Sequence, residues 1–286
     1  MPKDEVLIAM ERKRYHERLL QTGTLAINAN GVATNADKDS VISVMIAKGI
    51  AEQLMAETNE RVAGQTAGAS FEMLTMEFVK RTFPQLQHLR PGNWEVLKLG
   101  NRSRTKTSTF AQYEHLAYLT ELTKANRKLS AMIGNDYMVA PDIVVYRNLC
   151  SDEEINATEP IVNDTVCRYA DLREKNGGKA ILHASVSVSY THLTLPTKAS
   201  SAASDVYKRQ GHLPHIVVVT GEPLPSRIAS LALGTGDIDC VYHFALPELI
   251  ASVNSTERAD VIETLKTLVE GKRLKDISDL PLDLSV

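Results

Sequence analysis

Four short β-branched runs in the second half of the chain constrain the fold more than any other sequence feature. They are PDIVVYRN (141–148), KAILHASVSV (179–188), HIVVVTGEP (215–223) and DCVYHFALP (239–247). Each is apolar over most of its length rather than alternating, which is typical of strands covered on both faces. The runs therefore predict a buried sheet.

Helical patterns lie mainly in the first half of the chain. We expect helices over 4–20, over 41–57 with Ser40 as the N-cap, over 71–83 with Pro84 as the stop, and over 110–134 as one or two helices. Further helices are expected around 165–175 and 257–270, and the Gly-rich GQTAGAS (64–70) is expected to be a flexible lead. Strands and helices together predict an α/β or α+β fold. The length allows one large domain or two tightly joined ones, and we expect a single domain over 1–286.

Composition narrows the cellular setting. The chain is 43% hydrophobic with a net charge of −3, so global charge does not point to a nucleic-acid partner. The three cysteines, Cys150, Cys167 and Cys240, are widely spaced without metal-ligand spacing, which favours a reducing cytoplasm. No apolar run approaches the roughly 20 residues that span a bilayer, and the N-terminus is amphipathic rather than signal-like. We expect a cytoplasmic protein without a membrane segment.

Residues 188–210 interrupt the β-rich region with VSYTHLTLPTKASSAASDVYKRQ. DNA that encodes 188–197 can have a reverse complement that encodes 200–210, and this DNA resembles a transposase sequencing adapter with its mosaic end. Because chance rarely makes two neighbouring segments complementary, we interpret 188–210 as adapter sequence written over part of the gene. The alternative is an unusual natural loop. Under the adapter interpretation the following polar residues carry no functional information: Tyr190, His192, Lys198, Asp205, Lys208 and Arg209.

Several remaining residues have both a chemical and a structural interpretation. Asp142 opens a strand, where a carboxylate can hold a hard divalent ion, but Pro-Asp is more often a turn or cap. Glu72 adds a second carboxylate and is equally consistent with an exposed residue near a helix N-terminus. His183 and His243 lie on apolar strands and are expected to be core histidines. GTGDID (234–239) is expected to be a turn, and HLRPGNWEVLKLGNRSRTKT (88–107) a solvated loop and strand edge.

Longer segments resemble the NgoMIV-type restriction endonucleases, a branch of the PD-(D/E)XK nuclease superfamily. The resemblance covers nearly the whole chain outside 188–210. It rests on these runs: GVATNAD, IAKGIA, GQTAGASFE, LQHLRPGNW, PDIVVYRNL, LHASVS, LPHIVVVTGEPLPSRIASLALGTGDIDCVYHFALPEL and GKRLKDISDLPLDLSV. Runs of this length are far more specific than a single motif.

The resemblance implies a restriction-endonuclease-like fold, a central mixed β-sheet flanked by α-helices. It also implies Mg²⁺-dependent cutting of double-stranded DNA within the palindrome GCCGGC, by a homotetramer that engages two DNA sites. Asp142 matches the metal-binding aspartate, Glu72 the helix-borne glutamate, and Ser187 the serine of a Ser-Cys-Lys run. Val188 stands at the cysteine whose carbonyl binds the metal.

Other matches concern residues that read DNA bases and the position of the expected catalytic lysine. Asp37 and Arg227 match residues that read the outer G·C pair, and Gln65 matches a minor-groove contact. Without the resemblance, Asp37 is interpreted as a turn residue and Arg227 as a surface cation capping a helix. Ser189 stands at the essential lysine, while the second acidic residue and the segment that reads the central bases fall within 188–210. We therefore expect a type II restriction endonuclease. The chain with residues 188–210 as they stand, called the literal chain below, is expected to be inactive. The alternatives are a non-catalytic DNA-binding pseudo-nuclease and, less in keeping with the motifs, a metabolic α/β enzyme.

Overall fold

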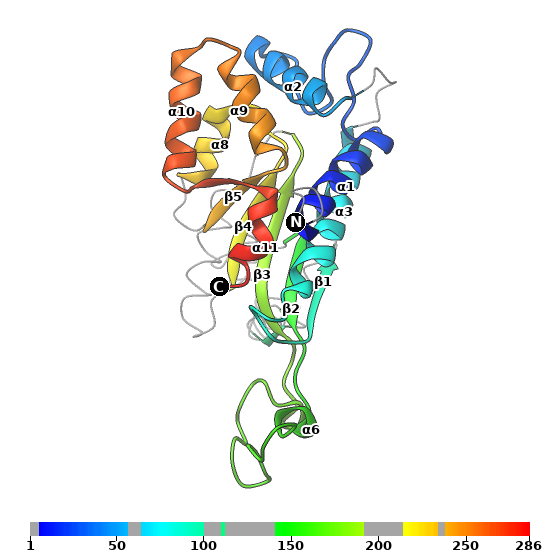
Figure 1. Ribbon diagram of the computed structural model, residues 1–286, viewed down its shortest axis with the longest axis vertical. Helices are drawn as coiled ribbons and strands as arrows, with labels where there is room; N and C mark the ends of the chain where they lie inside the picture. The colour runs from blue at the N-terminus through cyan, green and yellow to red at the C-terminus, as the bar shows by residue number, and fades with distance from the viewer. Residues whose placement is uncertain (1–5, 57–63, 100–109, 112–140, 192–213, 234–237) are drawn as a thin grey trace, which may run out of the picture.

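A mixed β-sheet forms the centre of the protein in a computed structural model (Figure 1). The structure describes residues 6–56, 64–99, 110–111, 141–191, 214–233 and 238–286. Within these ranges the sheet has six strands in the order of the sequence. They are β1 (Trp94–Lys98), β2 (Ile143–Arg147), β3 (Ile181–Ser189), β4 (His215–Thr220), β5 (Cys240–His243) and β6 (Leu274–Asp276).

The sheet changes character at β3. Strands β1, β2 and β3 pair antiparallel, whereas β3, β4, β5 and β6 run parallel to one another. The carboxyl ends of β1, β3 and β4 consequently lie at the same end of the sheet as the start of β2. The mixed sheet confirms the predicted fold class, and all four β-branched runs form strands.

Helices cover the sheet in two groups (Figure 1). The longer helices are α1 (Leu7–Gln21), α2 (Val41–Gln53), α3 (Gly64–Thr82), α8 (Pro225–Ala232), α9 (Leu246–Asn254) and α10 (Ala259–Glu270). Helices α1 and α3 pack against each other, and α3 also packs against β1 and β3. Helices α8, α9 and α10 gather near β5 and β6, and α2 packs on α9. Shorter elements are η2 (Phe83–Gln85), α6 (Asp152–Ile155), η7 (Glu174–Asn176), η8 (Ile277–Asp279) and α11 (Leu280–Asp283).

Local signals account for several helix boundaries. Ser40 caps α2 as predicted, since its hydroxyl accepts a hydrogen bond from the amide of Ser43. Helix α3 ends before Pro84, where η2 follows. The predicted helices at 4–20 and 257–270 are confirmed as α1 and α10. Of the predicted helical region 110–134, all but 110–111 lies outside the described residues, as do 234–237 of GTGDID.

Two expectations were wrong. GQTAGAS is the start of α3 rather than a flexible lead, because Ala67 within it and Phe71 directly after it are buried in the core and anchor the helix. The region 165–175 is not a helix: the Asn163 side chain accepts hydrogen bonds from the amides of Thr165 and Val166, which favours turns instead. Residues 94–98 of the expected loop and strand edge form β1, an edge strand of the described sheet, so the strand-edge part of that expectation is confirmed.

The segment 148–180 extends beyond the sheet as an arm that carries α6 (Figure 1). Arg173 is 2% exposed and its guanidinium donates hydrogen bonds to both carboxylate oxygens of Asp152 and to the carbonyl of Val166. One buried arginine thus joins the two sides of the arm, so the segment keeps a defined conformation without an apolar core of its own.

The main core lies between the sheet and the helices and is built from leucine, β-branched, aromatic and alanine side chains. Helix α2 approaches α9 closely at Gly49, where an added Cβ would lie 2.8 Å from Oγ of Ser252. The two predicted core histidines are buried: Nε2 of His183 lies 2.6 Å from the carbonyl oxygen of Leu284, and Nδ1 of His243 accepts a hydrogen bond from the amide of Ala245. None of the described helices is long and apolar enough to cross a membrane.

A buried ionic network joins the first helix to the last elements of the fold. Arg12 on α1 binds Glu248 on α9 at 2.7 Å and Asp276 at the end of β6 at 2.9 Å. Asp276 also accepts a hydrogen bond from the amide of Leu246 and caps η8. The network therefore fixes α1 against parts of the chain more than 230 residues away.

Candidate functional site

Asp142 lies at the start of β2, at the sheet end where β3 finishes. The backbone amide of Val188 donates a hydrogen bond to Oδ2 of Asp142 at 2.7 Å. Burial, with a smaller contribution from the charge of Glu72, raises the pKa of Asp142 to about 6, against the lowering effects of the Val188 amide and the Lys98 ammonium. Asp142 is thus a desolvated carboxylate with one fixed hydrogen bond.

The strand register explains how these residues meet. Ile143 pairs with Val186 in the antiparallel β2–β3 ladder, so one further step places Asp142 opposite Ser187. The Val188 amide points toward Asp142, and its carbonyl points the same way because N–H and C=O of one strand residue share a side. Two predicted site residues, Ser187 and Val188, are therefore brought to Asp142 by β3.

Glu72 reaches the same region from α3. Its Oε2 lies 2.8 Å from Nζ of Lys98, the last residue of β1. The same Nζ donates a hydrogen bond to the carbonyl of Ala69 at 3.2 Å. Because Glu72 and Lys98 both act on the pKa of Asp142, the three charges form one cluster at the sheet end.

The sequence alone does not single out Lys98. The cations of 88–107 share no helical face, which favours a solvated loop and strand edge. The alternation in WEVLK, whose burial alternates between buried and exposed from Trp94 to Leu97, was the signal for a strand. Even so, the pairing with Glu72 is non-local and follows only from the fold.

Ser189, at the position of the expected lysine, ends β3 without a cation. Its hydroxyl donates to the carbonyl of Thr191 at 3.2 Å. The next residue, Tyr190, is 4% exposed, and its hydroxyl lies 2.6 Å from both Oγ1 of Thr34 and the carbonyl of Thr24. Residues 192–213 lie outside the described residues, and with them the other polar residues of 188–210.

Asp37 and Arg227 form an ion pair, in which Nη2 of Arg227 donates to Oδ2 of Asp37. Arg227 also lies near the buried carboxylate of Glu222, with Nη1 3.6 Å from Oε2. The side chain of Asn35 donates to the carbonyl of Gly221 at 2.8 Å, while the Gly221 amide donates to the carbonyl of Ser189. These contacts place the Asp37 turn beside the ends of β3 and β4. The fold thus brings Asp37 and Arg227 into contact although they lie 190 positions apart in the sequence.

Gln65, the remaining predicted residue, lies on the first turn of α3, and its side chain is outside the described part of the structure. Glu72 lies seven residues further along the same helix, so α3 carries both residues toward one end of the sheet. This placement agrees with a shared site but gives no contact for Gln65.

The oxygen donors at the sheet end fit a hard divalent ion. They are the carboxylates of Asp142 and Glu72 and the carbonyl of Val188, and Mg²⁺ prefers one or two carboxylates with additional oxygen ligands. The described residues contain no group of three or more His, Cys, Asp and Glu side chains suited to a metal. Among the described residues, the Val188 carbonyl is therefore the further oxygen donor that could complete a site here, with water and substrate oxygens as the other ligands.

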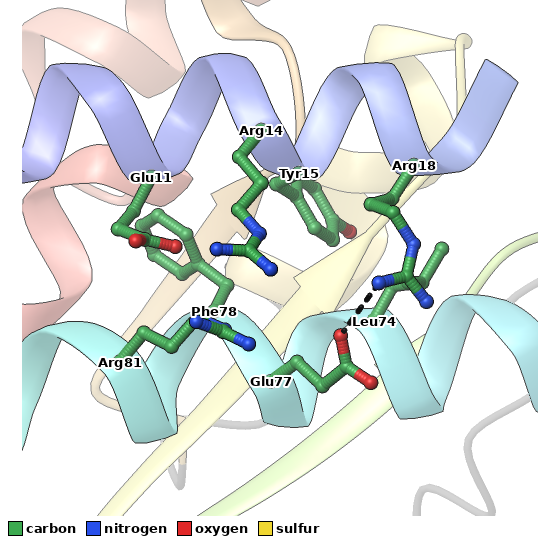
Figure 2. Close-up of a pocket in the computed structure, with 8 residues that line it drawn as sticks. All are labelled: Glu11, Arg14, Tyr15, Arg18, Leu74, Glu77, Phe78 and Arg81. Carbon is green, nitrogen blue, oxygen red and sulfur yellow. Dashed lines mark ion pairs between the residues drawn. The ribbon is translucent and has the colours of Figure 1, made fainter. Parts of the chain in front are cut away.

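A separate pocket lies between α1 and α3 and is drawn in Figure 2. Arg14 and Arg18 extend from α1, while Glu77 and Arg81 extend from α3, and Nη1 of Arg18 lies 3.6 Å from Oε2 of Glu77. Tyr15 and Phe78 form apolar parts of the wall. The mixed charges and aromatic contacts join two helices, and the pocket contains none of the predicted site residues.

Comparison with known proteins decides the family. The family model described as "NgoMIV restriction enzyme" matches residues 15–286. The chain belongs to this family. It is also 48% identical over 285 residues to the "Type II restriction enzyme NgoMIV" of Neisseria gonorrhoeae, which covers 98% of this chain and 99% of the relative.

Membership in the NgoMIV restriction enzyme family confirms the predicted enzyme class, type II restriction endonuclease, and agrees with the mixed sheet flanked by helices. Both matches extend across residues 188–210, so family sequence continues on each side of this segment. The Ser-Cys-Lys run that the resemblance implies would fall on Ser187, Val188 and Ser189, at the end of the sheet where Asp142 lies.

Proposed function

We propose that this protein is a site-specific endonuclease of a restriction-modification system that hydrolyses double-stranded DNA within GCCGGC with Mg²⁺. The observation that carries this proposal is the convergence of Asp142, Glu72 and the Val188 backbone at one end of the sheet. The protein acts in the cytoplasm as a single domain. Four copies assemble and engage two DNA sites.

Each residue of the cluster has a distinct task. Asp142 and the carbonyl of Val188 hold the ion, while the Val188 amide fixes the orientation of the Asp142 carboxylate. Glu72 adds negative charge from α3, and Ser187 lies opposite Asp142 where it can contact a phosphate oxygen. The bound ion supplies Lewis-acid polarisation of the phosphoryl group.

Asp37 and Arg227 read the outer base pair. An arginine donates two hydrogen bonds to O6 and N7 of guanine, and an aspartate accepts one from N4 of cytosine. The ion pair between Asp37 and Arg227 keeps a donor and an acceptor side by side, as one G·C pair requires. Gln65 contacts the minor groove from the start of α3.

The literal chain is catalytically inactive under this proposal. Ser189 cannot supply the ammonium that positions the attacking water and stabilises charge on the phosphate. Loss of one such transition-state donor in other enzymes lowers the rate by about 10²–10³-fold. The second acidic residue and the central base-reading segment are also absent, because adapter sequence occupies 188–210.

A chimaera tests the proposal directly. Residues 188–210 are replaced by the corresponding segment of the gonococcal relative, and both proteins are incubated with Mg²⁺ and a plasmid that contains GCCGGC. The chimaera is expected to cut the plasmid and the literal chain is not. A plasmid without the site is the control. Cutting by the literal chain, or failure of a folded chimaera to cut, would contradict the proposal.

A non-catalytic DNA-binding pseudo-nuclease is the second candidate. It is favoured by Tyr190, which packs in the core and bonds Thr24 and Thr34 as a native residue would. Resequencing codons 185–212 of the source gene separates the candidates. A Ser-Cys-Lys run restores the enzyme, whereas VSYTHL in the genuine gene leaves the binding protein.

A further inference from the structure

We propose that Lys98 is a positioning residue that partly offsets the charge of the Glu72 and Asp142 carboxylates and holds Glu72, so that a divalent ion must compete with its ammonium for the site. This inference rests on the proposed metal site. It goes further because it assigns a role to a β1 residue outside the active-site motif.

The backbone fixes Lys98 next to Asp142. Lys98 is paired with Ile143 in the β1–β2 ladder, and the amide of Leu99 donates to the carbonyl of Asp142 at 2.9 Å. The ends of two neighbouring strands therefore carry the ammonium and the carboxylate. No loop rearrangement is needed to bring these charges together.

Two acceptors on α3 hold the Lys98 ammonium. Oε2 of Glu72 lies 2.8 Å away and the carbonyl of Ala69 lies 3.2 Å away. Ala69 and Glu72 are three residues apart, so they lie on one face of the helix. The ammonium thereby holds the Glu72 side chain against the helix and restricts its rotation.

The net charge of Lys98, Glu72 and Asp142 determines how strongly the site attracts a divalent cation. With Lys98 the three side chains carry a net charge of −1 when both carboxylates are ionised, and without Lys98 the charge is −2. A divalent cation is attracted more strongly to the second arrangement. The side chains of Lys98 and Glu72 are 19% and 23% exposed, so solvent ions can reach the pair.

Direct Mn²⁺ binding to the full chain tests this role, with isothermal titration calorimetry and electron paramagnetic resonance of free Mn²⁺ as readouts. Lys98→Met is expected to bind Mn²⁺ about tenfold more tightly than the unmodified chain, since a nearby unit positive charge is removed. Lys98→Arg keeps the charge and is expected to bind like the unmodified chain. Asp142→Asn is expected to abolish binding.

A double-mutant comparison separates Lys98 from a general electrostatic effect. The effect of Lys98→Met is expected to shrink in a Glu72→Gln background, because the ammonium then has lost its partner. Lys48→Met is the matched control, since Lys48 forms an exposed pair with Glu52 at 3.5 Å on α2. Circular dichroism verifies that every variant is folded.

Each failure has its own meaning. Unchanged or weaker Mn²⁺ binding in folded Lys98→Met, with binding still lost in Asp142→Asn, would overturn the role of Lys98 alone. No Mn²⁺ binding by the unmodified chain, or equal binding by Asp142→Asn, would overturn the metal site and the Lys98 role together. A full effect of Lys98→Met in the Glu72→Gln background would overturn the positioning of Glu72.

Discussion

The backbone amide of Val188 donates a hydrogen bond to Oδ2 of Asp142, across 46 positions of sequence. A backbone donor is retained when the side chain at its position changes. The carboxylate therefore keeps its orientation whichever side chain stands at position 188. The architecture of the site is thus carried by strand geometry, and the chemistry is carried by the side chains that follow.

Asp142→Asn tests the electrostatic state of the site without metal. Because the pKa of Asp142 is raised from 3.8 to about 6, the folded state binds its proton more readily, so stability falls as pH rises through this window. At pH 8 the asparagine variant is expected to be more stable by about 1 kcal/mol, after allowance for partial screening. At pH 3.5 the difference is expected to vanish.

Urea unfolding at the two pH values measures the effect. Asp39→Asn is the control, because Asp39 is exposed in the turn before α2 and should change stability little at either pH. Destabilisation of Asp142→Asn at pH 8 would show that the hydrogen bond from Val188 outweighs the cost of burying the charge.

Arg227→Ala is expected to weaken discrimination at the outer base pair by about 1–3 kcal/mol. Fluorescence anisotropy compares a GCCGGC duplex with one whose outer pairs are changed, using the chimaera without divalent ions. Arg258→Ala is the control, since Arg258 pairs with the exposed Asp260. Equal discrimination by Arg227→Ala and the parent would remove Arg227 from base reading.

DNA binding by the literal chain should depend steeply on salt. Each phosphate contact releases counterions, and the logarithm of affinity falls linearly with the logarithm of salt concentration, with a slope of about −0.9 per phosphate. Because the proposed function places the central base-reading segment within the replaced residues 188–210, binding should depend little on the inner bases. Titrations between low and physiological salt measure the slope, and a slope near zero would argue against a phosphate-tracking surface.

Arg12→Met is expected to destabilise the fold by about 3–5 kcal/mol, because it leaves Glu248 and Asp276 without their cation in a largely buried network. Arg18→Met on the same helix is the control: its pair with Glu77 is more exposed and longer, and should contribute about 1 kcal/mol or less. Chemical denaturation measures both variants. Equal effects would indicate that the network contributes no more than a surface pair.

Sequence patterns identified the parts of the fold that local physics decides. The β-branched runs predicted four strands, and Ser40 predicted the start of α2 through its hydroxyl. The same reasoning failed where distant packing decides: GQTAGAS is glycine-rich, yet it is helical, with Ala67 within it and Phe71 directly after it buried in the core. Strand β6 is only three residues long and carries no comparable run.

The candidate site divides in the same way. The resemblance supplied Asp142, Glu72, Asp37 and Arg227, and the structure places them in two pairs of neighbours. The resemblance gave no indication of Lys98. Its ion pair with Glu72 joins a strand end to a helix and depends on how α3 packs on β1. Patterns along the chain do not encode that distance.

The ionic network around Arg12 has a consequence for synthesis of the protein. Helix α1 leaves the ribosome early, but its partners Glu248 and Asp276 are translated near the end of the chain. Since synthesis adds about 5–20 residues per second, α1 waits on the order of ten seconds or longer for these carboxylates. A nascent chain therefore cannot complete this network until β6 has emerged, which delays assembly of the DNA-cutting fold until translation is nearly finished.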